Sequence, residues 1–208
     1  MKYILTASLF LVNIFCATSV LAQSNDSTKI PNWNFNIEAN FNFTDPFFTL
    51  PIVTADKGKL HLEARYNYED LYTASGWIGY NFRDGKEFNY IITPMLGGVI
   101  GRIDGVAGGL EITLNYFEFQ FFSEMEYVFD LKSSGNNFLY NWTDLTYAPF
   151  NWFFGGLSTQ RTKTYQTNSD FQWGLFAGSG YSMFQLSCYF YNPGSDDFYT
   201  ILTLDINF

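Results

Sequence analysis

The sequence predicts an all-β protein, an antiparallel up-and-down β-barrel, and three observations lead to this fold class. The 208 residues include 24 Phe, 15 Tyr and 5 Trp, and aromatic residues favour strands. Apolar and polar residues alternate over most of the chain, and no long segment after the first has a sustained helical period of 3.6 residues. Short clusters of Gly, Asp, Asn and Pro separate the alternating segments, as turns separate strands.

The clearest alternation lies in residues 33–43. Apolar side chains occupy the odd positions from Trp33 to Phe43, and asparagine or Glu38 occupies the even ones. Because successive side chains of a strand point to opposite faces, this segment has one apolar and one polar face. Two later segments, 138–147 and 152–162, carry polar residues at both odd and even positions, so the pattern does not show which of their faces is the polar one.

Residues 1–22 are predicted to be an export signal rather than part of the fold. Lys2 precedes an apolar run at 4–15, and a small-residue cleavage site ends at Ala22. The apolar run is too short to span a bilayer. We expect a signal peptide at 1–22, an N-terminal periplasmic segment at 23–32 and a transmembrane β-barrel at 33–208. Removal of the signal takes away one lysine and no acid, leaving 10 basic and 20 acidic side chains and changing the net charge from −9 to −10.

Composition and motifs exclude several function classes. An acidic chain without a basic cluster is not expected to bind nucleic acid, because phosphate contacts need grouped Lys and Arg. Cys188 is the one cysteine left after processing, so no intramolecular disulfide is expected. With one histidine and no CxxC or HExxH motif, we expect no cofactor and no metal site.

The chain ends on an alternating apolar segment whose final residue is Phe208. This resembles the carboxy-terminal signature of outer-membrane β-barrel proteins, in which the last strand ends on an aromatic residue and carries the assembly signal. The resemblance implies an outer-membrane location in a Gram-negative bacterium, contact with membrane lipid, and insertion by the barrel assembly machinery. It is to the class as a whole, so it assigns no functional residues and no oligomeric state.

Aromatic residues gather at the ends of the alternating segments, where a membrane-interface girdle is expected. These residues are Trp33, Tyr66, Tyr68, Phe82, Phe88, Tyr127, Phe129, Tyr191, Phe198 and Phe208. A soluble barrel of this size would have to fill its whole interior with the apolar face or hold a large lipid. A membrane barrel instead needs an apolar exterior and a polar interior, which the alternation provides.

We expect twelve strands, since bacterial membrane barrels have an even number. Eleven follow from the pattern, at 33–43, 59–69, 72–82, 87–97, 106–115, 118–130, 138–147, 152–162, 170–178, 181–192 and 198–208. The twelfth is 47–54, although Pro51 has no N–H to donate within a closed sheet. Ten strands, with 44–58 as an outer loop, is the alternative.

With twelve strands the connections alternate between short turns and longer loops. The turns at the periplasmic end are expected near 55–58, 83–86, 116–117, 148–151 and 179–180. The outer loops are expected at 44–46, 69–71, 98–105, 131–137, 163–169 and 193–197.

The inward polar face is the candidate functional site. The predicted lumen-lining residues are Glu38, His61, Glu63, Arg65, Glu69, Glu111, Glu118, Glu124, Glu126 and Asp205. Carboxylates this close repel one another unless cations, water or arginine lie between them. Two interpretations remain open: a structural network that fills the interior, or an acidic pore lining that favours cations.

The leading functional hypothesis is a small passive pore or a structural membrane protein, with cation preference if it conducts. One alternative is a lipid-modifying acyl hydrolase or acyltransferase that uses His61, because such enzymes employ Asp/Glu-His-Ser sets. His61 lies near a periplasmic turn, however, and Glu63 is placed to hold it by a hydrogen bond. A secreted lipid-binding barrel is the other alternative.

Overall fold

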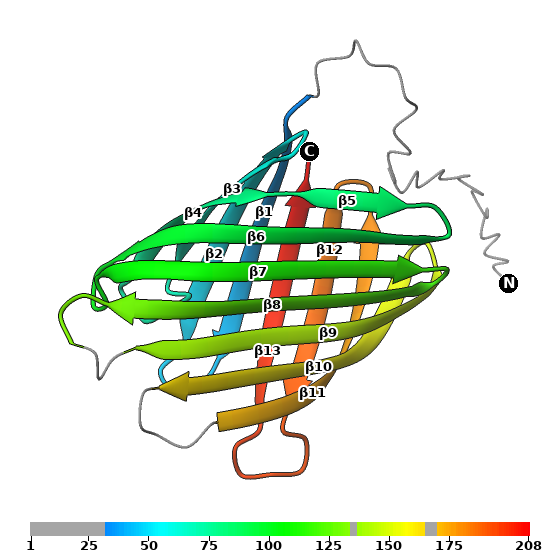
Figure 1. Ribbon diagram of the computed structural model, residues 1–208. Coiled ribbons are helices and arrows are strands. Elements are labelled where there is room, and N and C mark those ends of the chain that lie inside the picture. Colours follow the sequence, from blue (N-terminus) through cyan, green and yellow to red (C-terminus); the bar gives the residue numbers. More distant parts are fainter. Residues whose placement is uncertain (1–31, 134–136, 165–169) are drawn as a thin grey trace, which may run out of the picture.

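The structure, a computed structural model, describes residues 32–133, 137–164 and 170–208. The described residues form one antiparallel sheet that closes on itself, because β1 pairs with β13 and β4 pairs with β6 (Figure 1). The strands are β1 (Asn34–Phe43), β2 (Phe48–Lys57), β3 (Leu60–Tyr66), β4 (Ala74–Tyr80), β5 (Phe82–Gly85), β6 (Phe88–Ile100), β7 (Gly105–Tyr116), β8 (Phe119–Asp130), β9 (Phe138–Phe150), β10 (Phe153–Thr164), β11 (Asp170–Tyr181), β12 (Phe184–Tyr191) and β13 (Tyr199–Asn207).

The barrel has twelve wall strands because β4 and β5 are two parts of one strand. Both pair with β6, and Asn81 interrupts the strand between them. The buried Asn81 side chain donates to Asp56 Oδ1 at 2.5 Å and accepts from Thr93 Oγ1 at 2.6 Å. The predicted fold class, a twelve-strand up-and-down barrel, is therefore confirmed over the ten-strand alternative. Among the described residues, no helix has the length and apolar character needed to cross a membrane.

Pro51 is accommodated at a position where its missing N–H interrupts no ladder. The carbonyl of Thr49 accepts from Asn67 Nδ2 at 2.9 Å, so the polar groups of Thr49 point toward the side of β3. Pro51 lies two residues further along β2, so its backbone nitrogen and carbonyl also point toward the side of β3. The ladder between β2 and β3 begins only at Ile52, so Pro51 lies just beyond its end.

As predicted, short turns join the strands at one end of the barrel and longer loops join them at the other. At the end where β1 begins, the strands extend further than predicted. The turns at that end each have two residues, at 58–59, 86–87, 117–118, 151–152 and 182–183. They begin one to three residues later than predicted, because residues that resemble turn signals, such as Asp56, Asp84 and Gly85, lie at the last positions of the strands. The opposite end carries the connections 44–47, 67–73, 101–104 and 192–198 and the two loops with undescribed residues.

Some predictions fall outside the described residues. The signal peptide at 1–22 and nearly all of the segment at 23–32 lie there, as do residues 134–136 and 165–169 of two predicted outer loops. These assignments stay predictions.

The outer wall is apolar, with large side chains on alternate positions of neighbouring strands. Examples are Ile78, Leu96, Val106, Leu145, Leu157, Leu175 and Leu186. Most of the predicted girdle residues are exposed on this wall, including Trp33, Phe82, Phe198 and Phe208. Tyr191 is an exception, since its side chain is completely buried inside the barrel. Tyr68 is another, because its hydroxyl donates to the buried Glu124.

The interior is not purely polar, which corrects the sequence-based expectation. One inner cluster, from β4 to β9, consists of Trp77, Met95, Val99, Ile103, Ala107, Val128 and Phe138. A second, from β11 to β13, consists of Phe176, Tyr189, Tyr191 and Ile201 with Trp142, Phe154 and Tyr199 packed against it. Aromatic and aliphatic side chains therefore fill part of the space that the alternation assigned to polar groups.

Candidate functional site in the barrel lumen

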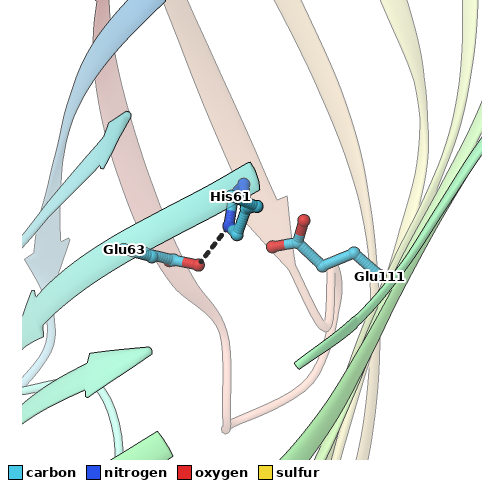
Figure 2. Close-up of side chains that lie close together, drawn as sticks. All are labelled: His61, Glu63 and Glu111. Carbon is cyan, nitrogen blue, oxygen red and sulfur yellow. Dashed lines mark hydrogen bonds and ion pairs between the residues drawn. The ribbon is translucent and has the colours of Figure 1, made fainter. Parts of the chain in front are cut away.

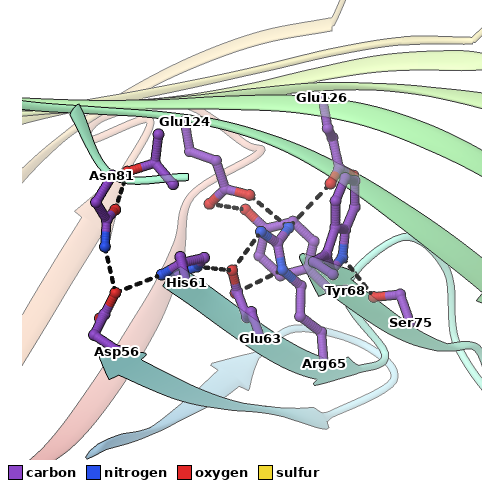
Figure 3. A network of polar contacts seen from close by, with 11 residues as sticks. Asp56, His61, Glu63, Arg65, Tyr68, Ser75, Asn81, Glu124 and Glu126 are labelled. Atoms are coloured by element: carbon purple, nitrogen blue, oxygen red, sulfur yellow. Dashed lines mark hydrogen bonds and ion pairs between the residues drawn. The ribbon is translucent and has the colours of Figure 1, made fainter. Parts of the chain in front are cut away.

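Arg65 on β3 is the centre of a buried ion-pair network (Figure 3). Its Nε and Nη2 donate to the two carboxylate oxygens of Glu63 at 2.7 and 3.1 Å. Its Nη1 lies 2.5 Å from Glu124 Oε1 and 3.0 Å from Glu126 Oε2, both on β8. The side chains of Arg65 and Glu126 have no solvent-accessible surface. Paired, charge-assisted contacts of this kind are what allows an arginine to be buried.

Aromatic rings cover the guanidinium group. Its central carbon lies 4.3 Å from the centre of the Tyr68 ring and 4.8 Å from that of Trp77. The Tyr68 hydroxyl donates to Glu124 Oε2 at 2.7 Å. Burial, followed by the adjacent Glu124 carboxylate, raises the pKa of Tyr68 well above its ordinary value, so this hydroxyl remains a donor.

His61 is held from both sides, near the turn that joins β2 and β3. Its Nδ1 lies 3.2 Å from Asp56 Oδ1 and its Nε2 lies 3.4 Å from Glu63 Oε2. Asn81, between β4 and β5, fixes Asp56 in turn, so a continuous hydrogen-bonded chain leads from Asn81 through His61 to Arg65 (Figure 3). The contact with Glu63 is the one that the sequence pattern predicted.

Glu111 on β7 approaches this chain from across the lumen, since β4 and β6 lie between β3 and β7 in the wall (Figure 2). One ligand atom from each of His61, Glu63 and Glu111 lies within 4.8 Å of the others. An imidazole and two carboxylates are a donor set that zinc accepts. However, both oxygens of Glu63 already accept hydrogen bonds from Arg65, so the ion-pair network accounts for this cluster without a metal.

The remaining predicted lumen residues occupy three different environments. Glu38 and Asp205 face each other in the β1–β13 ladder, and Glu38 Oε1 accepts from Asn40 at 2.5 Å. Glu69, in the loop after β3, is buried, and neither of its carboxylate oxygens has a hydrogen-bond partner. Glu118 lies in the two-residue turn between β7 and β8 and is exposed, because β8 begins one residue later than predicted.

Asp144 on β9 is a buried acid that the sequence pattern did not single out. Its Oδ1 accepts from Ser158 Oγ at 2.5 Å and from Trp142 Nε1 at 2.7 Å, and its Oδ2 accepts from Tyr189 at 3.1 Å. The pattern could not tell the inner face of this strand from the outer one, because Asn141 and Thr143, on the face opposite to Asp144, are also polar. Those two side chains bond to each other and to Ser123.

A cavity of about 470 Å³ opens at the loop end of the lumen, and we call it the outer vestibule. Its walls are Tyr68, Glu69, Asp70, Arg102, Ile103, Phe138, Tyr140 and Thr162. The exposed Arg102 forms an ion pair with Asp70 at 3.3 Å.

Comparison with known proteins gives likeness in structure only. No protein-family model matches the chain, and no curated protein sequence matches it. The structure is similar to the KdgM porin, with a TM-score of 0.58 and 9% identity over 84% of this chain and 98% of that chain. It is also similar to Omp33 of Acinetobacter baumannii, with a TM-score of 0.48 and 12% identity over 86% and 99% of the two chains. OpdK of Pseudomonas aeruginosa has a TM-score of 0.46 and 8% identity over 82% and 60%.

The likeness to the KdgM porin, at this low identity, shows a shared fold. Together with the apolar outer wall and the closed ring of twelve strands, it defines the class: the chain has the fold of an outer-membrane β-barrel protein. This likeness concerns the fold alone, and no subfamily is assigned.

Proposed function

We propose that this protein is a narrow, cation-preferring channel in the outer membrane of a Gram-negative bacterium. The observation that carries this proposal is the charge of the lumen. Carboxylates line it on several strands: Glu38, Glu63, Glu111, Glu124, Glu126, Asp144 and Asp205. Among the residues whose burial is described, His61 and Arg65 are the buried basic side chains. An excess of negative charge in a confined aqueous path concentrates cations and repels anions.

The ion-pair network supports a narrow passage. Arg65 on β3 contacts β8, and three wall strands separate β3 from β8 in the sheet. The bridge therefore crosses the lumen instead of following a ladder between neighbouring strands. A cation that passes this level has to move beside the carboxylates of Glu63, Glu124 and Glu126, which also favours cations over anions.

A sealed structural barrel is the second candidate. The complete burial of the Arg65 and Glu126 side chains favours it, since water does not reach either group. The acyl hydrolase or acyltransferase alternative receives less support, because the hydrogen-bond partners of His61 are the carboxylates of Asp56 and Glu63. A secreted lipid-binding barrel also receives less support, because a soluble barrel needs a polar exterior and this outer wall is apolar.

The partners that we propose are membrane lipid around the apolar wall and the barrel assembly machinery. The exposed Phe208 at the end of the last strand supports recognition by that machinery. Fractionation of cells that produce the full chain tests this part of the proposal. Recovery in the outer-membrane fraction is expected, and recovery in the soluble fraction would contradict it.

Planar-bilayer recording tests the channel itself. The full chain is reconstituted between two KCl solutions that differ tenfold in concentration, and the reversal potential is measured. We expect small unitary currents whose reversal potential has the sign of a potassium current. The opposite sign would refute cation preference, and a protein that inserts without conducting would support the sealed barrel. Glu87→Gln, at an exposed residue of the turn between β5 and β6, is the matched control and should behave as the unmodified chain.

A further inference from the structure

Glu69 is a buried carboxylate without a hydrogen-bond partner, and it lines the outer vestibule. Only 8% of its surface is accessible, and both carboxylate oxygens lack a partner. Burial of an unsatisfied carboxylate is costly, and buried polar groups in proteins are nearly always paired. Because Glu69 forms part of the vestibule wall, a ligand in the vestibule is placed to supply the missing donor once the carboxylate turns toward it.

The loop that carries Glu69 is pinned at both ends. The Asn67 amide N–H donates to the Thr73 carbonyl at 2.8 Å, and Asn67 Oδ1 accepts from the Tyr72 amide at 2.7 Å. Asn67 Nδ2 also bonds to Thr49 on β2. Asn67 and Tyr72 both have a φ of 60°, in the left-handed region. This closed seven-residue connection fixes the position of Glu69 instead of leaving it to the solvent.

The walls around Glu69 are aromatic. The Tyr68 and Tyr140 rings meet edge to face with their centres 5.4 Å apart, and Phe138 lies two residues before Tyr140 on the inner face of β9. Aromatic faces attract cations and pack on apolar carbon. The volume of about 470 Å³ lies within the usual range of small-molecule pockets, roughly 300–1,000 Å³.

The charges near the vestibule leave Glu69 uncompensated. Arg102 in the wall is paired with Asp70. Arg65 contributes its donors to Glu63, Glu124 and Glu126. Glu126 stands directly opposite Tyr140 in the β8–β9 ladder, and its Oε1 lacks a hydrogen-bond partner. The vestibule therefore carries negative charge beside apolar rings.

We propose that the outer vestibule binds a small organic cation of the alkylammonium class. Glu69 accepts hydrogen bonds from the ammonium group, and the rings of Tyr68, Phe138 and Tyr140 pack against the carbon chain. A bare metal ion fits less well, because calcium or magnesium needs about six oxygen ligands and these walls are largely aromatic. Binding at this site goes beyond the proposed channel function, since it requires no ion flux.

Isothermal titration calorimetry on the folded full chain in detergent micelles tests the proposal. Three probes of matched size are used: n-butylammonium, the neutral n-butanol and the anionic butyrate. We expect n-butylammonium to bind at least tenfold more tightly than either of the others. Equal binding of n-butanol, or no detectable binding of n-butylammonium, would overturn the proposal. Because this comparison uses the unmodified protein, it does not depend on the folding of any variant.

Glu69→Gln tests the role of the carboxylate, and Glu87→Gln is the control at the opposite end of the barrel. Glu69→Gln should weaken n-butylammonium binding at least tenfold and leave n-butanol binding unchanged, whereas the control should match the unmodified chain. Unchanged affinity of Glu69→Gln for n-butylammonium would refute the site. If the protein binds n-butylammonium but does not conduct in planar bilayers, the binding site stands and the channel function is refuted. The two proposals can therefore fail separately.

Discussion

Arg65 and Glu126 are joined across the lumen, with Arg65 Nη1 3.0 Å from Glu126 Oε2. They lie 61 residues apart in the sequence, on β3 and β8, and β4, β6 and β7 separate them along the wall. Glu63 and Glu124 complete the same network. One contact therefore bears on both the stability of the barrel and the width of its interior.

Arg65→Gln should destabilise the barrel and widen the passage. Removal of one partner from a buried ion pair typically costs about 3–5 kcal/mol, because the remaining charges are left uncompensated. Urea unfolding, followed by tryptophan fluorescence, measures the free energy of unfolding, and bilayer recording measures the unitary conductance. Arg83→Gln, at an exposed residue of β5, is the control. Unchanged stability and unchanged conductance for Arg65→Gln would show that the bridge does not control the lumen.

Two neighbouring glycines on β6 should respond differently to the same substitution. A Cβ at Gly97 would lie 2.5 Å from the Trp77 ring, whereas a Cβ at Gly98 meets nothing within 4 Å. Gly97→Ala should therefore cost about 1–3 kcal/mol by overpacking and shift the tryptophan emission. Gly98→Ala should leave both unchanged. Equal effects of the two substitutions on the free energy of unfolding would contradict the inward position of Trp77.

Asp144→Ala should destabilise the contact between β9, β10 and β12. The substitution leaves Ser158, Trp142 and Tyr189 without their acceptor, and an orphaned buried donor costs about 1–3 kcal/mol. Asp144→Asn retains one acceptor oxygen and should lose less. Thermal unfolding in detergent compares the two variants. A smaller loss for Asp144→Ala than for Asp144→Asn would contradict the role of Asp144 as a shared acceptor.

The contact between two outer loops should depend on pH in the acid range. The Lys132 ammonium and then the Gly101 amide hold the pKa of Asp104 below its ordinary value of 3.8. Because the pKa is lowered by folding, the contact is fully present above pH 3.8 and is lost as the pH falls through the lowered pKa.

An NMR titration of the Gly101 amide shift measures this loss. The midpoint should lie below 3.8, and Asp104→Asn should remove the titration. A midpoint above 3.8 would contradict the pairing of Asp104 with Lys132.

The period-2 pattern predicted the wall strands because it depends on local geometry alone. It placed His61, Glu63 and Arg65 on one inner face, and the three are buried there. It could not predict the bridge from Arg65 to β8, which depends on how the closed ring of strands brings distant walls together. The pattern also missed Tyr189 and Tyr191, which point inward. Both faces of this strand carry aromatic residues, so the alternation of apolar and polar residues could not tell the inner face from the outer one.

The reversal potential in a tenfold KCl gradient, compared between the unmodified chain and the double variant Glu124→Gln with Glu126→Gln, tests the central claim most directly. If lumen carboxylates select cations, the unmodified chain has a cation-selective potential and the double variant moves toward zero or reverses. An anion-selective potential in the unmodified chain, or an identical potential in both proteins, would contradict the claim.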